Sequence, residues 1–395
     1  MKHALEGLKV IDLTRVLAGP YATMILADFG AEIIKIEVPN TGDDSRAFGP
    51  YVNGESAYFM SINRNKKSLT LNLKTDEGKE ILKKLVEKAD VLVENFRPGT
   101  MEKLGLGYDV LKEINPKLIY AASSGYGHTG PYSQRAAYDA VVQAMGGIMS
   151  ITGSKGGKPT RVGTSIGDIA AGLFTAIGIL TALNYRNETG KGQKVDVAML
   201  DCQVAMLENA IARYTATGNI PKPDGNKHSS IVPFESFETK NGDIMVAAGN
   251  DSLFKKLCIS LGIEQVSNDS RFSTNPLRNE NYSEIKEILV DIFAQKTTDE
   301  WMSILDDAGV PNSPINTIDK VIENPQVVAR DMVKTVKHKV AGEVKMPGIA
   351  IKLSDTPGSI EIAAPLLGEH NEEILKKYLF MSDNDINELR EKSII

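Results

Sequence analysis

Residues 8–37 read LKVIDLTRVLAGPYATMILADFGAEIIKIE and predict a strand, a helix and a second strand. The apolar run 8–13 forms the first strand, and the run 32–37 forms the second. Between them, the Gly-Pro pair at 19–20 opens a helix and Gly30 closes it. Proline suits the first turn of a helix, and glycine suits the position just after its end.

The same unit recurs along the chain. A helical pattern at 76–88 precedes a strand at 90–94, and one at 109–113 precedes a strand at 118–122. This alternation predicts an α/β fold with an open, doubly wound, mainly parallel, Rossmann-like sheet. The turn after the first strand, 14–20, has neither the G-x-G-x-x-G pattern nor a Walker lysine. It therefore argues against a dinucleotide-dependent oxidoreductase or a kinase.

The pattern of predicted strands and helices changes after a Gly/Pro/Asn-rich stretch at 217–226. A hairpin is predicted at 234–248 around a Lys-Asn-Gly turn. Helices are predicted at 252–261, 281–294 and 299–308. We therefore expect a large α/β domain at 1–200 and 330–395, linkers at 201–225 and 313–329, and a small α+β domain at 226–312.

Composition narrows the class of protein. The 395 residues carry a net charge of −6 with both signs interspersed, which gives no basic field for nucleic acid or anionic membrane. The N-terminus lacks the form of a signal peptide, and the apolar run 169–183 is shorter than the roughly 20 residues that cross a bilayer. Cys202, Cys258 and five scattered histidines suggest neither a disulfide framework nor a metal site. We expect a cytoplasmic protein with no metal and no permanently bound cofactor.

Asp168 is the only charged residue between Arg161 and Arg186, and the apolar run 169–183 follows it. A carboxylate at the start of a helix is stabilised by the free N–H groups and by the positive end of the helix dipole. The simplest interpretation is an N-cap aspartate, worth roughly 1 kcal/mol. A functional carboxylate is the alternative, and the position alone does not separate the two.

Further motifs surround the Asp168 segment. They are 5–20 (LEGLKVIDLTRVLAGP), 30–37 (GAEIIKIE), 42–46 (GDDSR), 63–68 (NRNKKS), 94–99 (ENFRPG), 125–131 (GYGHTGP) and 189–193 (TGKGQ). In this order they resemble the class III CoA-transferase (CaiB/BaiF) family over essentially the whole chain. The resemblance implies that Asp168 is the catalytic nucleophile, that acyl-CoA and a small carboxylic acid are the substrates, and that two interlocked chains form a homodimer.

The resemblance also implies a CoA site. Its residues would be Val16, Leu17, Leu71, Lys74, Asn95, Phe96, Arg97, Lys103, Arg135 and Tyr138. Plainer interpretations remain for several of them. The two lysines and Arg135 suit a solvated surface, Val16 and Phe96 suit a core, and Asn95 suits a cap on the following Pro-Gly turn.

A racemase branch of the family places a histidine where this chain has Tyr138. Removing a proton beside a thioester needs an acid/base pair, and a tyrosine with a pKa near 10 is a poor second base. His128 lies ten residues upstream in a glycine-rich loop, where a structural role suits it better. We therefore favour CoA transfer. A 2-methylacyl-CoA racemase-type isomerase and a non-catalytic acyl-CoA-binding protein are the alternatives.

The acceptor is predicted from the branch that the motifs resemble most. Leu17 and Val38 replace the glutamine and arginine of formyl-CoA transferases, and the stretch 226–234 replaces their glycine-rich loop. Together with 42–46, it resembles succinyl-CoA:glutarate and acetyl-CoA:oxalate transferases. The candidate ligands for an acceptor carboxylate are Arg46, His228 and Ser229. Linker polarity explains the last two equally well, and Arg46 has two alternatives, CoA phosphate and Asp43.

Carboxylate chemistry then predicts the reaction path. Attack by Asp168 on the donor thioester gives an aspartyl anhydride, and the released CoA thiolate converts it to an aspartyl-CoA thioester. An anhydride keeps the energy of the thioester, whereas a serine ester would trap the acyl group. Backbone N–H groups near Gly19 and Gly167 are the expected oxyanion donors, each worth about 3 kcal/mol if correctly aimed.

Overall fold

The computed structural model describes residues 3–395 and divides the chain into two compact units. The first unit comprises the chain up to Ile148, Arg161–Gly218 and Gln326–Ile395, and the second comprises Met149–Thr160 and Asn219–Pro325. Each is described by itself.

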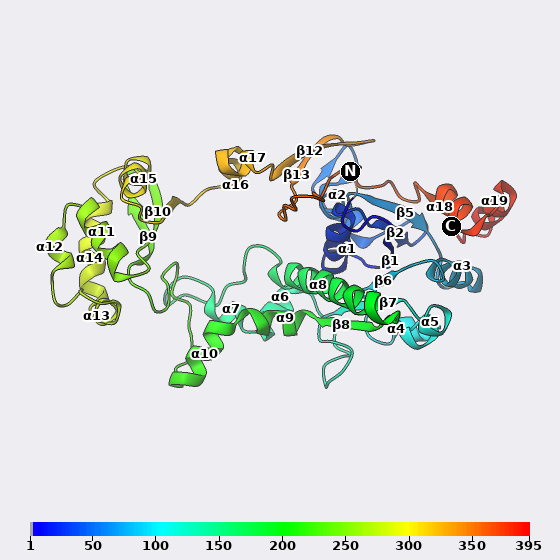
Figure 1. Ribbon diagram of the computed structural model, residues 1–395, viewed down its shortest axis with the longest axis horizontal. Helices are drawn as coiled ribbons and strands as arrows, with labels where there is room; N and C mark the ends of the chain where they lie inside the picture. Colours follow the sequence, from blue (N-terminus) through cyan, green and yellow to red (C-terminus); the bar gives the residue numbers. More distant parts are fainter. Residues whose placement is uncertain (1–2) are drawn as a thin grey trace. The chain divides into compact units, whose positions relative to one another are not determined.

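A six-stranded parallel sheet forms the centre of the first unit, with strand order β5-β2-β1-β6-β7-β8 (Figure 1). Its strands are β1 (Lys9–Asp12), β2 (Glu32–Glu37), β5 (Lys66–Thr70), β6 (Val91–Glu94), β7 (Ile119–Ser124) and β8 (Lys194–Ala198). The order reverses direction at β1 and β6, which is where open α/β sheets bind ligands, beyond the carboxyl ends of the strands. The α/β, doubly wound prediction is confirmed.

Helices cover both faces of this sheet. The helices of the first unit are α1 (Ala18–Asp28), α2 (Ala57–Ile62), α3 (Asp76–Val86), α4 (Thr100–Lys103), α5 (Tyr108–Ile114), α6 (Asp139–Met145), α8 (Ile166–Thr189), α9 (Met199–Met206), α10 (Glu208–Thr217), α18 (Asn371–Leu379) and α19 (Asp383–Glu391). Odd and even strand residues point to opposite faces. On β1, Ile11 therefore packs in one core with α3 and α18, and Val10 packs in the other with α1 and α8.

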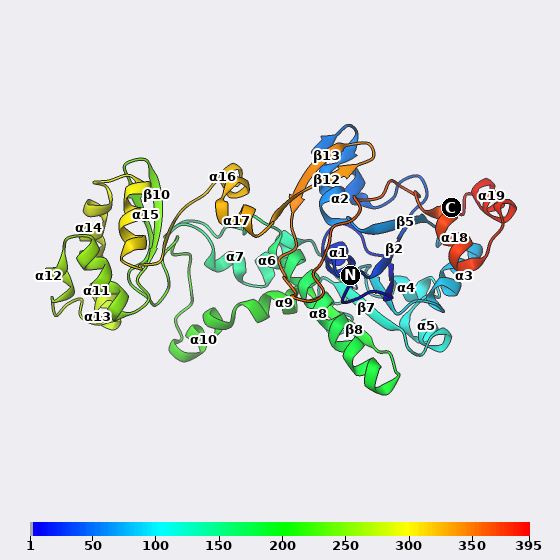
Figure 2. The ribbon, with the colours of Figure 1, turned by 45° about the horizontal axis from the view of Figure 1, so that its top comes forward.

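Short elements complete the first unit. They are the 3-10 turn η1 (Asp44–Ala47), the strands β3 (Tyr51–Val52) and β4 (Glu55–Ser56), and the hairpin of β12 (Val333–His338) and β13 (Gly342–Pro347). Helix α16 (Ile318–Glu323) and all but the first residue of α7 (Ile148–Ile151) belong to the second unit, and all but the first residue of α17 (Pro325–Ala329) belong to the first. The β12–β13 hairpin lies beside α2 (Figure 2), and Ala341 in its turn shares a small core with Phe59 and Met60 of α2. This contact fixes the β12–β13 hairpin against α2 within the first unit.

Helix α8 is longer than the sequence suggested. It spans Ile166–Thr189, 24 residues, where the apolar run predicted about 15. By length and composition it could cross a membrane, but half of its most apolar window is buried within the protein. It lies against α1 so closely that a Cβ on Gly172 would sit 2.7 Å from the carbonyl oxygen of Ala18. The prediction that this helix is too short to cross a bilayer is therefore wrong. The structure shows α8 packed against α1.

The second unit has its own antiparallel sheet and core. Its elements are β9 (Phe234–Thr239), β10 (Gly242–Ala247), β11 (Asn312–Pro314), α11 (Asp251–Ser260), α12 (Glu264–Ser267), α13 (Asn275–Glu280), α14 (Tyr282–Phe293) and α15 (Thr298–Asp307). The predicted hairpin forms, with Phe237 opposite Ile244. The ring of Phe293 stacks on Phe237 and meets the edge of Trp301 inside this core.

The linker segments hold more structure than expected. The segment 201–225 contains most of α9 and all of α10, and 313–329 contains α16 and α17. Within α9, Cys202 and Gln203 are buried. Packing of these buried side chains stabilises α9 as a helix. The weak apolar periodicity of 201–225 did not indicate a helix there.

Candidate active site

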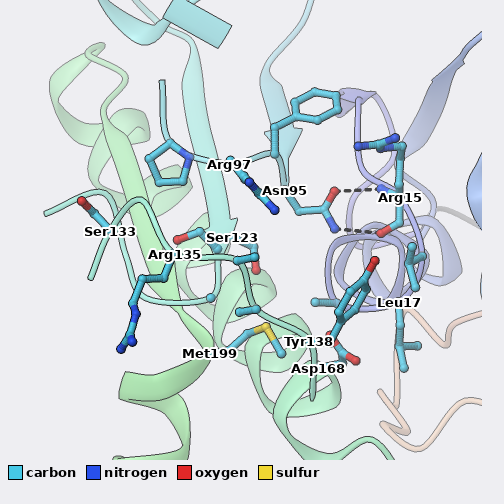
Figure 3. A pocket seen from close by; sticks show the side chains of 18 of the residues that line it. Arg15, Leu17, Asn95, Arg97, Ser123, Ser133, Arg135, Tyr138, Asp168 and Met199 are labelled. Atoms are coloured by element: carbon cyan, nitrogen blue, oxygen red, sulfur yellow. Dashed lines mark hydrogen bonds between the residues drawn. The ribbon is translucent and has the colours of Figure 1, made fainter. Parts of the chain in front are cut away.

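Four chain segments meet beyond the carboxyl ends of β1, β6 and β7. They are the loop between β1 and α1, the 95–98 loop after β6, the end of β7 with the long loop that follows it, and the first turn of α8; Asp44 of η1 and Met199 of α9 complete the lining. They enclose a cavity lined by Arg15, Val16, Leu17, Ala18, Asp44, Asn95, Phe96, Arg97, Pro98, Ser123, Ser124, Gly125, Ser133, Arg135, Ala136, Ala137, Tyr138, Asp168 and Met199 (Figure 3). We call it the Asp168 cavity.

Asp168 lies in the first turn of α8 and does not cap the helix. The N-cap residue is Ser165, so the N-cap interpretation is wrong. Within residues 3–395, no hydrogen bond or ion pair reaches the Asp168 carboxylate. Burial, and then the nearby Asp139 carboxylate, raise its pKa to about 7. A carboxyl group without a partner and with a raised pKa is typical of a functional site rather than of a structural one.

Asp139 holds the start of α8 in place. Its Oδ1 accepts the backbone N–H of Gly167 at 2.8 Å, and its Oδ2 accepts the side-chain amide of Gln143 at 2.7 Å. Gln143 in turn accepts the N–H of Val162 at 2.8 Å. Because the Gly167 N–H is already bonded, it is not available as an oxyanion donor, which corrects the expectation for that group.

The start of α1 is the better source of oxyanion donors. Leu17 is the N-cap and supplies no capping side chain. Leu17 and Ala18 both line the Asp168 cavity, whereas Gly19 does not. In the part of the chain that the structure describes, the N–H groups of Leu17 and Ala18 make no hydrogen bond. Free N–H groups at a helix start favour developing negative charge.

The 95–98 loop fixes the opposite wall. Asn95 accepts the Arg15 N–H at 2.8 Å and donates to the Arg15 carbonyl oxygen at 2.7 Å (Figure 3). The Phe96 ring lies 5.2 Å below the Arg15 guanidinium, and the Phe96 N–H donates to Glu94 at 2.8 Å. Asn95 thus ties two loops together rather than capping its own turn.

A second, more apolar cavity adjoins the first, since Arg15 and Phe96 line both. Its other lining residues are Leu13, Thr14, Ile36, Glu37, Val38, Gly42, Asp43, Leu71, Asn72, Leu73, Lys74, Thr100 and Leu104. Leu71 and Lys74, two of the predicted CoA contacts, belong here. Lys103 lines neither cavity and is exposed, next to Leu104.

Most predicted CoA contacts thus gather around the two joined cavities. Val16, Leu17, Asn95, Phe96, Arg97, Arg135 and Tyr138 line the Asp168 cavity. The sequence analysis missed Arg15, Ser123 and Asp139. Arg15 lies in the 5–20 motif next to Val16, and Asp139 directly follows Tyr138. Their position next to predicted site residues could have identified them. Ser123 gave none.

Tyr58 was also missed. Burial, followed by the Asp168 and other carboxylates, raises its pKa to about 12. The aromatic residue therefore lies within electrostatic reach of Asp168, although it does not line either cavity.

Arg46 has a structural role. Its guanidinium binds both carboxylate oxygens of Glu37 at 2.7 and 2.8 Å, donates to the Pro365 carbonyl oxygen at 3.0 Å, and lies 3.7 Å over the Phe59 ring. It lines neither cavity. The predicted role as an acceptor ligand is therefore wrong, and so are the two alternatives, contact with a CoA phosphate and pairing with Asp43. The Arg46 guanidinium is instead bound to Glu37 on β2.

His228 and Ser229 belong to the second unit. The His228 ring stacks on Phe234 at 5.1 Å, and its Nδ1 accepts the Ser230 N–H at 3.2 Å, which leaves Nε2 as the atom free to donate. Their role toward an acceptor stays a prediction. His128 is held in its loop by Lys194 at 3.0 Å and lines neither cavity.

No cluster of three or more His, Cys, Asp or Glu within residues 3–395 is arranged to hold a metal ion.

Comparison with known proteins identifies the family of this chain. The model of CoA-transferase family III matches residues 5–371. The chain belongs to this family. It is 43% identical over 392 residues to human succinyl-CoA:glutarate CoA-transferase, covering 99% of this chain and 90% of the relative. It is 44% identical to acetyl-CoA:oxalate CoA-transferase of Acetobacter aceti, covering 95% of this chain and 96% of the relative.

A solved structure of this fold gives the same result. The crystal structure of a CaiB/BaiF family protein from Brucella suis superposes with a TM-score of 0.85 at 40% identity, over 96% of this chain and all of that one. The family resemblance drawn from the motifs is confirmed.

Proposed function

We propose that this CoA-transferase moves CoA from an acyl-CoA to a free carboxylic acid, with Asp168 as the nucleophile. The observation that carries the proposal is the Asp168 carboxyl group, unpartnered and facing a cavity built from the start of α1 and the 95–98 loop. Among the described residues, Asp44 is the one other acid that lines this cavity, and Arg15 pairs with it at 3.2 Å.

The proposed reaction uses Asp168 as a carrier of CoA. A carboxylate oxygen of Asp168 attacks the thioester carbon, the C–S bond breaks, and CoA thiolate leaves a mixed anhydride. The thiolate attacks the aspartyl carbonyl carbon, and the donor acid departs as its carboxylate. The acceptor carboxylate then displaces the thiolate from Asp168, and the thiolate attacks the acceptor carbonyl carbon, which frees Asp168.

The raised pKa of Asp168 suits this role. A carboxyl group with a pKa of about 7 is half ionised at neutral pH, and its carboxylate is more basic than that of an ordinary aspartate. The N–H groups of Leu17 and Ala18 are the proposed donors to the oxyanion that forms on the attacked carbonyl.

The two joined cavities suggest how CoA binds. The thioester end would lie in the Asp168 cavity, and the nucleotide end would lie in the apolar cavity with Leu71 and Lys74. Phe96 and Arg15 stand where the two meet. Lys103 is exposed next to Leu104, which lines the apolar cavity, and its proposed role is to contact a phosphate group of CoA.

The acceptor that we propose is a short dicarboxylate. Three arginines, Arg15, Arg97 and Arg135, line the Asp168 cavity, and a second carboxylate needs such partners because burying an unpaired charge is costly. The glutarate and oxalate transferases among the relatives support the same class. We expect succinate and glutarate to exceed butyrate and pentanoate at least tenfold in kcat/KM, about 1.4 kcal/mol.

The racemase alternative lacks a second base. Racemisation needs an acid/base group on each side of the carbon, and no histidine of the described chain lines either cavity. Tyr138, which stands where that branch has its histidine, is exposed and beside Asp168 (Figure 3).

We also propose a homodimer. Leu173, Phe174, Ile177 and Leu180 of α8 are 40–57% exposed in the single chain, an apolar stripe suited to burial by a second copy. Interlocking of the two chains stays a prediction.

One assay tests the proposed function. Wild-type protein is mixed with succinyl-CoA and a panel of free acids, and the exchanged thioester is measured by mass. Asp168→Ala should abolish exchange and leave CoA binding intact. An exchanged product from Asp168→Ala would refute the nucleophile. If wild-type protein binds acyl-CoA but forms no exchanged thioester with any acid of the panel, the non-catalytic alternative would be favoured.

A further inference from the structure

Val16 holds an unusual backbone conformation in the wall of the Asp168 cavity. Its φ is +67°, in the left-handed region. Within residues 3–395, six other non-glycine residues have positive φ, and none of them is β-branched. Left-handed backbone is unfavourable for a β-branched side chain, and such strain persists only where the surroundings enforce it. Something in the fold must hold Val16.

The holding group is Asp43. Its Oδ1 accepts the Val16 N–H at 3.0 Å, together with the N–H and hydroxyl of Ser45 at 2.9 and 2.8 Å. The Asp43 N–H donates to Glu37 at 3.0 Å, so the carboxylate is fixed from its own backbone. Asp43 follows β2, whereas Val16 follows β1, and the bond therefore joins the ends of adjacent strands.

A buried lysine completes the clamp. Lys35 Nζ lies 2.8 Å from Asp43 Oδ2, and both side chains are fully buried. The same ammonium donates to the Thr14 carbonyl oxygen at 2.8 Å. A buried ion pair contributes little net stability. Here the Lys35 ammonium fixes two groups near Val16. It holds the Asp43 carboxylate, which binds the Val16 N–H, and it holds the carbonyl oxygen of Thr14, two residues before Val16.

The clamp sits directly upstream of the catalytic wall. Arg15 is fixed by Asn95, Val16 is fixed by Asp43, and Leu17 is the N-cap of α1. The left-handed turn at Val16 thus determines where the uncapped start of α1 lies relative to the cavity that contains Asp168.

We propose that Asp43, backed by Lys35, is a positioning residue for CoA transfer. It holds Val16 in the left-handed conformation and so aims the start of α1 at the carbonyl group that Asp168 attacks. This inference rests on the proposed transfer reaction. Asp43 acts through Val16 and does not touch the reacting atoms.

The test compares two variants that both remove the buried charges. Lys35→Met with Asp43→Asn keeps an oxygen that accepts the Val16 N–H, and Lys35→Met with Asp43→Leu does not. Both variants lack Lys35 and differ only at position 43, in the group that accepts the Val16 N–H, and we expect kcat of the leucine variant to be at least tenfold below that of the asparagine variant. CoA affinity, measured by calorimetry, should differ less than threefold between the two variants.

A third substitution tests the role of the backbone. Glycine reaches φ +67° without steric cost, so Val16→Gly added to the leucine variant should recover kcat at least threefold. Equal activity of the asparagine and leucine variants, or no recovery with Val16→Gly, would overturn the proposal. If the leucine variant does not fold, Asp43→Ala in the Lys35→Met background takes its place.

A matched control separates this effect from lost stability. Arg64 and Asp28 form another buried ion pair, 2.7 Å apart, which lines neither cavity. Arg64→Met with Asp28→Asn should lower the unfolding midpoint and leave kcat within twofold of wild type. A tenfold loss there would assign the Asp43 effect to stability. A wild-type protein that exchanges no CoA would instead refute the proposed function.

Discussion

Replacing Asp168 by asparagine should stabilise the protein while abolishing CoA transfer. The folded state raises the pKa of Asp168 from its ordinary 3.8 to about 7, through burial and then Asp139. The ionised carboxylate is therefore unfavourable in the folded protein. Asparagine has the same shape without the charge, so it removes this cost, as expected where a functional group opposes stability.

The difference between 3.8 and about 7 sets the magnitude. Each pKa unit corresponds to about 1.36 kcal/mol, so the full effect is at most about 4 kcal/mol per chain. The protonated Asp168 contributes stability that is fully present below the unfolded pKa of 3.8, and that stability is lost as the pH rises to about 7. The advantage of Asp168→Asn should therefore grow between pH 4 and pH 7 and level off above.

Urea unfolding at fixed protein concentration measures this advantage. We expect a higher midpoint for Asp168→Asn than for wild type at pH 8, and less than half of that gain in free energy at pH 5. Asp201→Asn, at an exposed position on α9, is the control and should show no such pH dependence. Equal stability of Asp168→Asn and wild type at pH 8 would refute the argument that burial raises the pKa of the nucleophile.

Three other predictions concern the site and the assembly. Asp139→Asn removes the negative charge that raises the Asp168 pKa, so the acid limb of the kcat/KM profile should move from about pH 7 to lower pH, and an unmoved limb would exclude that charge effect. Hydroxylamine added after acyl-CoA should yield a hydroxamate at Asp168, found by peptide mass. Label at Cys202 or Cys258 would contradict this, since burial raises the pKa of those thiols to about 11 and 12 and keeps them protonated. If the chains interlock, dilution should release no folded monomer, and ultracentrifugation that detects one would disprove the interlocked dimer.

The sequence alone was sufficient to predict the α/β pattern and to single out Asp168 as the candidate nucleophile. The strand–helix–strand signal of 8–37 is local, because apolar runs and the glycine and proline at the helix ends depend only on neighbouring residues. Asp168 stood out for a similar reason, as a lone charge before an apolar helix. The family motifs placed Asn95, Phe96 and Tyr138, and the structure brings these residues to the same cavity.

Only the tertiary structure decided how the side chains are used. The Arg46 guanidinium donates to the Glu37 carboxylate, and the Gly167 N–H donates to Asp139. The Val16 N–H donates to Asp43, which holds Val16 in its left-handed conformation. In each case the partners are 9–28 positions apart in the chain and meet only where the loops beyond the sheet converge. Likewise, the pKa of Asp168 depends on burial and on a charge 29 residues away. Burial and distance are properties of the folded chain, and no local pattern of residues encodes them.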